Sequence, residues 1–242
     1  MSTYARTGFW LTLFLTAIAG GILALGIEFV AFRRLRIKQS PLIFYFVSSI
    51  TMGVLLENLI TIFFSSNFYS YPLFFDYAVI ELGESIIAVT DLLMLGISVG
   101  ALSLLMLVIY RTKLGVAIRA LSMDIPTTSL MGVNVTLIIA ATFFVSGFLG
   151  GISGMFLGMN YTLYPQIGKM IVKGFIASVL GGLGNMAGAV IGALLLGILE
   201  VALTGIDFIG SGLAPVVIFI IIIIFLIVRP QGIAGIIIQE KA

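Results

Sequence analysis

The stretch that decides the fold is Ala214–Val228, which reads APVVIFIIIIIFLIV and contains no charged residue. Its apolar residues follow one another without the apolar and polar alternation that marks the strands of a membrane β-barrel. An α-helix rises about 1.5 Å per residue, so about 20 residues cross a hydrocarbon layer of about 30 Å. The stretch is therefore predicted to be a membrane-embedded helix.

Similar apolar runs recur along the whole chain. A further segment, Ile171–Leu180, is apolar but too short to cross a bilayer unaided. The sequence therefore predicts an all-α, polytopic membrane protein with about six to seven membrane segments. The other runs that are long enough and almost free of charge are Phe9–Ala31, Leu42–Phe64, Leu92–Tyr110, Thr136–Met159 and Met186–Leu203.

The composition excludes several classes of protein. Of 242 residues, 61% are hydrophobic and 9% are charged, whereas soluble domains carry about 25% charged residues. The chain contains no Cys and no His, so disulfides, thiolate nucleophiles, haem imidazole ligands and the usual zinc sites have no residues to form them, and we expect no metal site. A net charge of +2 is too small for a nucleic-acid binding surface, so membrane lipid is the expected surrounding and nucleic acid is not an expected partner.

Positive charges orient the segments, because Lys and Arg accumulate in cytoplasmic loops. They gather in residues 33–38, in residues 111–119 and at the C-terminal end. Residues 65–90 carry three acidic residues and no basic one, which predicts an external loop and an external N-terminus. An odd number of crossings then follows, with Ile171–Leu180 as the seventh segment.

Glycines form two ladders with a period of four residues. Gly150, Gly154 and Gly158 form the first, and Gly184, Gly188 and Gly192 form the second. Small residues at this spacing occupy one helix face and let a neighbouring backbone approach closely. Both ladders therefore predict tight helix packing.

A glycine-rich break precedes the second ladder, where Gly181, Gly182, Gly184 and Asn185 fall within five residues. Each glycine weakens a helix by about 1 kcal/mol relative to Ala, so we expect the helix to end there. Two interpretations remain open. The segment is a cytoplasmic turn between antiparallel helices, or it is a broken helix whose polar backbone lines a translocation pathway.

A charged residue inside an apolar membrane segment costs free energy, so we expect each to have a partner of opposite charge or a functional role. Glu28 lies close to the cytoplasmic arginines and Glu200 close to the end of its segment, so a local ion pair or an extended side chain accounts for each. Asp91 follows Thr90 at an expected helix start, where a carboxylate is favourable. Glu57 and Asn58 lie deeper, and a structural polar pocket and a translocation pathway explain them equally well.

The segment from Arg111 to about residue 135 carries the most information. Leu114, Ala117, Ile118 and Leu121 recur at helical spacing, which predicts a short amphipathic helix that Pro126 ends. The helix docks on a partner or lies flat in the lipid headgroups. The chain contains no phosphate-binding loop, so energy for pumping must come from an ion gradient or from another subunit.

Several blocks of residues resemble, in order, the permease subunits of ABC importers for branched-chain amino acids. The segment 111–120, RTKLGVAIRA, with Asp124 and the block 131–135, is similar to the coupling loop of that family. The other similar blocks are 26–28 with 32–36, 181–189, 197–200 and 229–232.

The resemblance implies a division of labour between subunits. Two ATPase subunits, which bind ATP and Mg²⁺, dock on the coupling loops; a second permease subunit completes the pathway, and an external solute-binding protein delivers the solute. The resemblance also implies that this chain itself binds no cofactor and is not an enzyme. The residues that the resemblance assigns to the ATPase contact are Gly115, Ala117, Arg119, Ala120, Asp124 and Gly132, and the possible pathway residues stay Glu57, Asn58, Gly181, Gly182, Gly184 and Asn185.

The external loop is rich in aromatic residues. It offers a surface for the binding protein, although aromatic anchoring at the membrane interface explains it as simply. The aromatic residues concerned are Tyr69, Tyr71, Phe74, Phe75 and Tyr77.

One departure from the family concerns the beginning of the chain. Members of this type begin with further spans that contain an Asn-Phe-Ala-His-Gly-like motif, and this sequence has no His. We therefore expect residues 1–242 to form a single transmembrane permease domain that lacks those spans. The expected protein is a permease of a prokaryotic inner or plasma membrane for branched-chain amino acids or related small polar solutes; the alternative is a secondary carrier or channel that no ATPase drives.

Overall fold

The computed structural model describes residues 2–64, 67–70, 79–82, 85–182, 184–206, 210–229 and 231–234. The chain divides into two compact units, residues 1–167 and residues 168–242. Each unit is described by itself below. Every apolar run that the sequence assigns to the membrane forms a helix.

The first unit begins with a long helix that changes its winding once. Helix α1 (Ser2–Ile27) continues through a π-helical turn, η1 (Glu28–Phe32), into α2 (Arg33–Ile37). Helix α3 (Leu42–Phe64) follows after a short turn. A hairpin of β1 (Val79–Leu82) and β2 (Ser85–Ala88), paired antiparallel, lies in the expected external loop.

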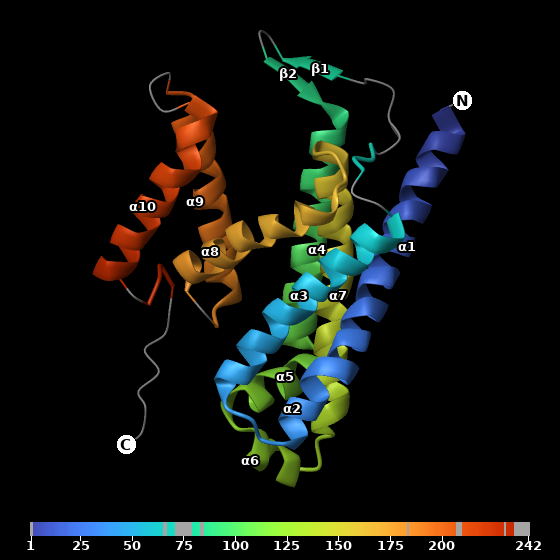
Figure 1. The fold of residues 1–242 in the computed structure, drawn as a ribbon, viewed down its shortest axis with the longest axis vertical. Coiled ribbons are helices and arrows are strands. Elements are labelled where there is room, and N and C mark those ends of the chain that lie inside the picture. Colours follow the sequence, from blue (N-terminus) through green and yellow to red (C-terminus); the bar gives the residue numbers. More distant parts are fainter. Residues whose placement is uncertain are drawn as a thin grey trace. The chain divides into compact units, whose positions relative to one another are not determined.

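Two long helices and a short helical pair complete the first unit. Helix α4 (Val89–Arg111) leads into α5 (Lys113–Met123) and α6 (Ile125–Leu130), and α7 (Val135–Asn160) follows. Helix α1 packs along α7, and Figure 1 shows the two side by side.

The second unit starts within the 3-10 helix η2 (Pro165–Met170), at Gly168. Its elements are α8 (Ile171–Gly181), α9 (Met186–Thr204) and α10 (Gly210–Val228). A core of Leu180, Leu196, Ile218 and Ile222 joins these three helices. In the described part of the chain, five helices are long and apolar enough to cross a membrane, and α8 and the apolar part of α10 are shorter.

The first glycine ladder is placed differently from the prediction. On α7, Gly147 and Gly151 meet α1, where Cβ atoms would collide with Gly20 and Thr16. Gly150 and Gly154 are exposed and meet nothing within 4 Å. The assignment of Gly150 and Gly154 to the packed face was wrong, because the face of α7 that meets α1 runs through Gly147, Gly151 and the buried Met155. Gly158, the third position of the ladder, is buried.

The second ladder is confirmed at two of its three positions. Gly188 and Gly192 pack against the α8 backbone, where added Cβ atoms would collide with Gly181 and Ala177. Gly184 takes no part in this contact, because it lies in the turn before α9 with a φ of +87°. The close approach fixes α8 and α9 as an antiparallel pair.

Candidate functional site

The segment 111–135 folds into two short helices joined by a one-residue corner. The predicted amphipathic helix is α5, which begins after Thr112, where the Thr112 hydroxyl accepts a hydrogen bond from Gly115 N at 3.2 Å. It ends before Asp124 and not at Pro126, which stands in the first turn of α6 instead. Proline suits that place because the first helical amide needs no partner within the helix.

Asp124 caps α6. Its carboxylate accepts hydrogen bonds from Thr127 N at 3.1 Å and from the Thr127 hydroxyl at 2.6 Å. These bonds stabilise the charged form and hold the pKa of Asp124 below its ordinary value. The corner between α5 and α6 is thereby fixed by a local polar contact.

Two of the residues assigned to the ATPase contact hold α5 against the end of α4. Gly115 is buried, and a Cβ there would collide with the backbone of Ile109. The Arg119 guanidinium donates a hydrogen bond to the Ile109 carbonyl and lies 5.6 Å from the Tyr110 ring centroid. Arg119 thus satisfies a carbonyl at the end of α4, in addition to any contact that it makes with a partner.

The remaining predicted contact residues divide by exposure. Ala117 and Ala120 are half-buried, whereas Asp124 and Gly132 are exposed. The most exposed apolar side chains of the segment are ones that sequence reasoning did not select: Met123 at 89%, Leu130 at 90% and Met131 at 81%. We call these three residues the apolar tip. Their apolar character within a polar loop was the signal that could have found them.

Glu57 and Asn58 lie on α3. Asn58 is exposed, and its side-chain amide donates a hydrogen bond to Val54 O at 2.7 Å within the same helix. Glu57 is half-buried, and its carbonyl accepts a hydrogen bond from the Thr61 hydroxyl. These residues belong to the first unit and the 181–185 segment to the second, so each candidate stands by itself and the pathway role of both remains a prediction.

The glycine-rich segment 181–185 forms the connection between α8 and α9, as the expected end of the helix requires. Gly182 has a φ of +109°, a conformation that glycine adopts without strain. Asn185 caps α9 by accepting a hydrogen bond from Gly188 N at 3.1 Å, and its amide donates to Ala234 O at 2.9 Å. Leu183 lies outside the described residues.

Two sequence blocks that are far apart along the chain meet at this turn. Ile233 N donates to Leu180 O at 2.9 Å and Ala234 N donates to Gly181 O at 3.0 Å. Gly232, with a φ of +76°, lies so close that a Cβ would come within 2.6 Å of Gly182 N. The chain after α10 thus supplies donors for the carbonyls at the end of α8, while Pro230 lies outside the described residues.

The beginning of the external loop is pinned to the end of α7. Tyr69 and Leu163 exchange two backbone hydrogen bonds of 2.9 and 2.8 Å. Beside them lies a cavity of about 410 Å³ lined by Phe64, Tyr164 and their neighbours. Tyr71, Phe74, Phe75 and Tyr77 lie outside the described residues.

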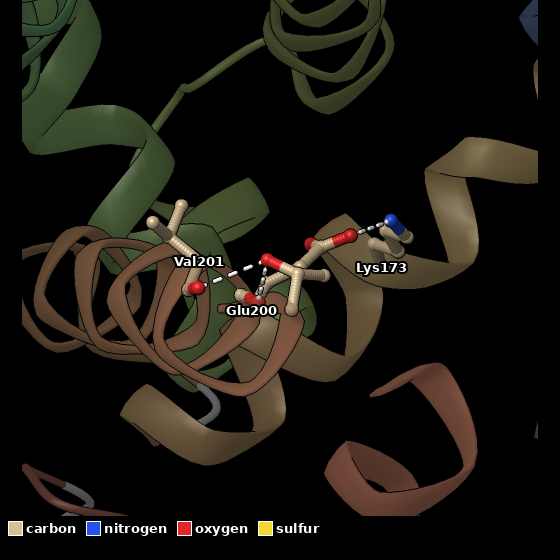
Figure 2. Close-up of polar contacts among 4 residues, drawn as sticks. Lys173, Glu200 and Val201 are labelled. Carbon is tan, nitrogen blue, oxygen red and sulfur yellow. Dashed lines mark hydrogen bonds and ion pairs between the residues drawn. The ribbon is translucent and has the colours of Figure 1, made fainter. Parts of the chain in front are cut away.

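Two of the charges expected to be balanced locally have ion-pair partners. Glu28, in the π-helical turn, is 3% exposed and lies 3.0 Å from the Arg36 guanidinium. Glu200 of α9 lies 2.5 Å from the Lys173 ammonium of α8, and Figure 2 shows these side chains pointing toward each other. Of the two explanations that the sequence left open for these glutamates, the structure shows the ion pair for both.

Among the residues that the structure describes, no three His, Cys, Asp or Glu side chains gather closely enough to hold a metal ion. The arrangement instead offers helix packing, a capped helical pair with an apolar tip, and two ion pairs. These features suit a membrane component that packs its helices closely and docks on a partner.

Comparison with known proteins identifies the family. Residues 1–227 match the family described as branched-chain amino acid transport system / permease component. The chain is 35% identical over 217 residues to the high-affinity branched-chain amino acid transport system permease protein BraD of Pseudomonas aeruginosa, which covers 86% of this chain and 69% of that protein. It is 34% identical over 215 residues to the permease protein LivH of Escherichia coli K12, which covers 86% and 68%.

A relative that is named for another solute also matches, over a shorter stretch. The ribose import permease protein RbsC of Haemophilus influenzae is 36% identical over 107 residues, which cover 40% of this chain and 32% of that protein. No solved structure matches the chain. The resemblance found in the sequence is thus confirmed over nearly the whole chain, and the protein belongs to the family of multi-pass membrane permease components of branched-chain amino acid transport systems.

Proposed function

We propose that this chain forms part of the pathway of an ATP-driven importer for branched-chain amino acids or closely related small solutes. In this assembly the segment 111–135 docks separate ATPase subunits, which bind ATP and Mg²⁺. A second permease subunit completes the pathway, and an external solute-binding protein delivers the solute. Family membership and the names of the BraD and LivH relatives support the solute class and the division into subunits.

The observation that carries the docking role is the apolar tip on a rigid helical pair. Gly115 and Arg119 fix α5 to the end of α4, and Asp124 fixes α6 to α5. Met123, Leu130 and Met131 are nevertheless left almost fully exposed. Burying one such side chain in a partner contributes about 1.5–3 kcal/mol, so the tip has the character of a docking surface and the fixed helices can transmit a force to α4.

The docking test replaces one side chain of the tip. We expect Leu130→Asp to lower both co-purification of the ATPase subunits and ATP-driven uptake at least tenfold, because a carboxylate would be desolvated in the contact. The membrane level should stay unchanged, since Leu130 is 90% exposed. Leu130→Met keeps an apolar side chain of similar volume and is the matched control, with near-normal uptake.

The solute test uses the assembled transporter with its binding protein. We expect ATP-dependent uptake of leucine, isoleucine or valine and no uptake of ribose. Uptake that survives ATP depletion but collapses with an uncoupler would instead establish a secondary carrier. Ribose uptake without leucine uptake would move the solute class to that of the RbsC relative.

A further inference from the structure

An ion pair between two apolar helices remains unused by the proposed docking and packing roles. Lys173 lies in the first turn of α8 and Glu200 lies near the end of α9. Their charged atoms are 2.5 Å apart, and the Lys173 ammonium faces the Glu200 carboxylate (Figure 2). Both helices are otherwise apolar, with no further charged residue within their bounds.

The ion pair continues the line of contacts between the antiparallel helices α8 and α9, which we call the seam. Gly192 of α9 lies against the α8 backbone at two places. One is Gly181, and the other is Ala177, which lies one turn of α8 before Gly181. Ala177 and Leu196, one turn further on their helices, are both buried. One more turn on each helix reaches Lys173 and Glu200. The ion pair is therefore the last level of a tightly packed seam, about 12 Å from the level of Gly181 and Gly192 by helical rise.

The rigid seam fixes where the two charges lie. Because glycine backbones set the short distance between α8 and α9, the backbones that carry the two charged side chains lie close together. The two groups thus form a preformed pair of opposite charges at the end of the helix pair that lies away from the 182–185 turn.

The pair is reachable from outside the chain, unlike the other ion pair described. The side chains of Lys173 and Glu200 are 47% and 33% exposed, whereas those of Arg36 and Glu28 are 18% and 4% exposed. An ammonium has three donors and a carboxylate has about four acceptor positions, and the mutual contact uses a fraction of them. Ionisable residues within apolar membrane helices commonly mark the pathways of polar solutes.

We infer that Lys173 and Glu200 form a binding subsite for the charged groups of a free α-amino acid. The Lys173 ammonium binds the α-carboxylate and the Glu200 carboxylate binds the α-ammonium. This inference rests on the proposed function, since it names the pathway group that receives the solute. The side chain of the amino acid meets apolar surface, for which Val172 and Val201, 53% and 74% exposed, are the chain neighbours of the pair.

The chemistry of the exchange is balanced. An α-amino acid carries one positive and one negative group on a single carbon, so it can replace the contact between Lys173 and Glu200 by two charge-assisted contacts. The total charge of the site stays zero, which avoids an uncompensated charge among apolar helices. A sugar carries neither charge and cannot replace the ion pair in this way.

The test measures binding of tritiated leucine to the assembled transporter, with two competitors that each lack one charge. The competitor 4-methylpentanoate lacks the ammonium, and isoamylamine lacks the carboxylate. We expect Glu200→Gln to weaken leucine binding at least tenfold while competition by 4-methylpentanoate is kept. Lys173→Gln should weaken leucine binding similarly and keep competition by isoamylamine. A purely structural ion pair would not produce this crossed pattern.

A charge exchange gives a second, independent readout. Exchanging the carboxylate and ammonium positions around a tetrahedral carbon inverts its handedness. The double variant Lys173→Glu with Glu200→Lys keeps an ion pair and is expected to lower the preference for L-leucine over D-leucine at least tenfold. Full recovery of L-leucine binding in this variant, with unchanged stereopreference, would show a structural pair and overturn the inference.

Matched controls neutralise exposed charges elsewhere. Lys38→Gln and Asp91→Asn remove one lysine and one acid from exposed positions in the first unit, and leucine binding should remain normal in both. Wild-type binding in both single variants at 173 and 200 overturns the inference and leaves the importer assignment intact. A wild-type complex that handles ribose and not leucine overturns the proposed function itself.

Discussion

At the scale of single residues, small contacts decide where backbone segments can meet. Gly232 and Gly182 both have positive φ and touch each other across the turn after α8. Arg119 and Asp124 each satisfy a backbone group at a helix end. Each of these contacts can be removed by a single substitution that leaves the others in place, and each substitution gives a prediction.

Gly232→Ala should destabilise the second unit. The new Cβ would lie 2.6 Å from Gly182 N and 2.8 Å from Val179 O, and a positive φ costs a residue other than glycine about 1–3 kcal/mol. Thermal unfolding in detergent, with accumulation in the membrane, measures the loss. Gly150→Ala is the control, because its Cβ meets nothing within 4 Å and alanine favours a helix; equal stability of the two variants would contradict the packing of 232 on 182.

Arg119→Glu should detach α5 from α4 and abolish ATP-coupled transport, with membrane insertion intact. The carboxylate would face the Ile109 carbonyl that the guanidinium now binds, and a hydrogen bond from a charged donor contributes about 1.5–3 kcal/mol. Arg119→Lys keeps the charge without the planar donor group and should give an intermediate effect. The assay measures solute uptake and co-purification of the ATPase subunits. Normal transport in Arg119→Glu would contradict the assignment of the segment 111–135 to the ATPase contact.

Acid should weaken the α6 cap only at low pH. The hydrogen bonds from Thr127 depress the pKa of Asp124 below 3.8, so the cap stabilises the folded form above that value. The contribution is lost as pH falls through the folded pKa, below about pH 4. Asp124→Asn keeps an acceptor without titrating. The stability difference between wild type and Asp124→Asn should stay constant from about pH 8 to pH 5 and change only below; a change near neutral pH would contradict the cap.

At the scale of elements, backbone proximity joins the helices into pairs. α1 meets α7 through Gly147 and Gly151, and α8 meets α9 through Gly181, Gly188 and Gly192. Close approach of this kind depends on the absence of a side chain, since dispersion contacts fall off steeply with distance. The fixed α8 and α9 pair is also what holds Lys173 and Glu200 together.

Gly151→Val should separate α1 from α7. A side chain there would collide with Thr16 O and the Ala17 backbone, and overpacking of a close contact costs about 1–3 kcal/mol. Gly154→Val carries the same helix-propensity penalty in open space, so the difference in melting temperature between the two variants isolates the contact. If Gly154→Val lowers the melting temperature more than Gly151→Val does, the interface between α1 and α7 runs through Gly150 and Gly154 instead.

At the scale of the whole molecule, charge orients the chain in the membrane. The positive residues of 33–38 and 111–119 predict that both segments lie on the cytoplasmic side. The loop at 65–90, which has no positive residue, is predicted to lie on the external side. The structure adds that Tyr69 is tied to Leu163, which puts the segment after α3 and the segment after α7 on the same side. The number of true crossings stays a prediction.

Single-cysteine labelling can test this orientation cleanly, because the chain has no native Cys. Tyr69→Cys, at a half-exposed position, should react with an impermeant maleimide on intact cells. Met123→Cys and Lys38→Cys, both at exposed positions, should react only after permeabilisation. Labelling of Met123→Cys on intact cells would reverse the topology and remove the segment 111–135 from the ATPase side.

Much of the fold could be predicted because its determinants are local. Length and apolar character located the helices, Thr112 and Asn134 cap α5 and α7 as their residue types favour, and the amphipathic spacing located α5. Less of the candidate site could be predicted from the sequence. Gly150 and Gly154 were placed on the wrong face and the apolar tip was missed, because both depend on how a helix is turned against a neighbour. Pro126 was given the wrong role for a local reason, since α5 already ends before Asp124, which caps the next helix.

The sequence by itself determined the helical membrane class, the family and the place of the coupling segment, since these follow from composition, periodicity and ordered blocks along the chain. Only the tertiary structure decided which glycines meet a backbone, that Gly232 closes on Gly182, and that Lys173 meets Glu200. The physical reason is that these helices are apolar on nearly every side. No polar face then marks their rotation, and contacts between residues far apart in the chain settle it.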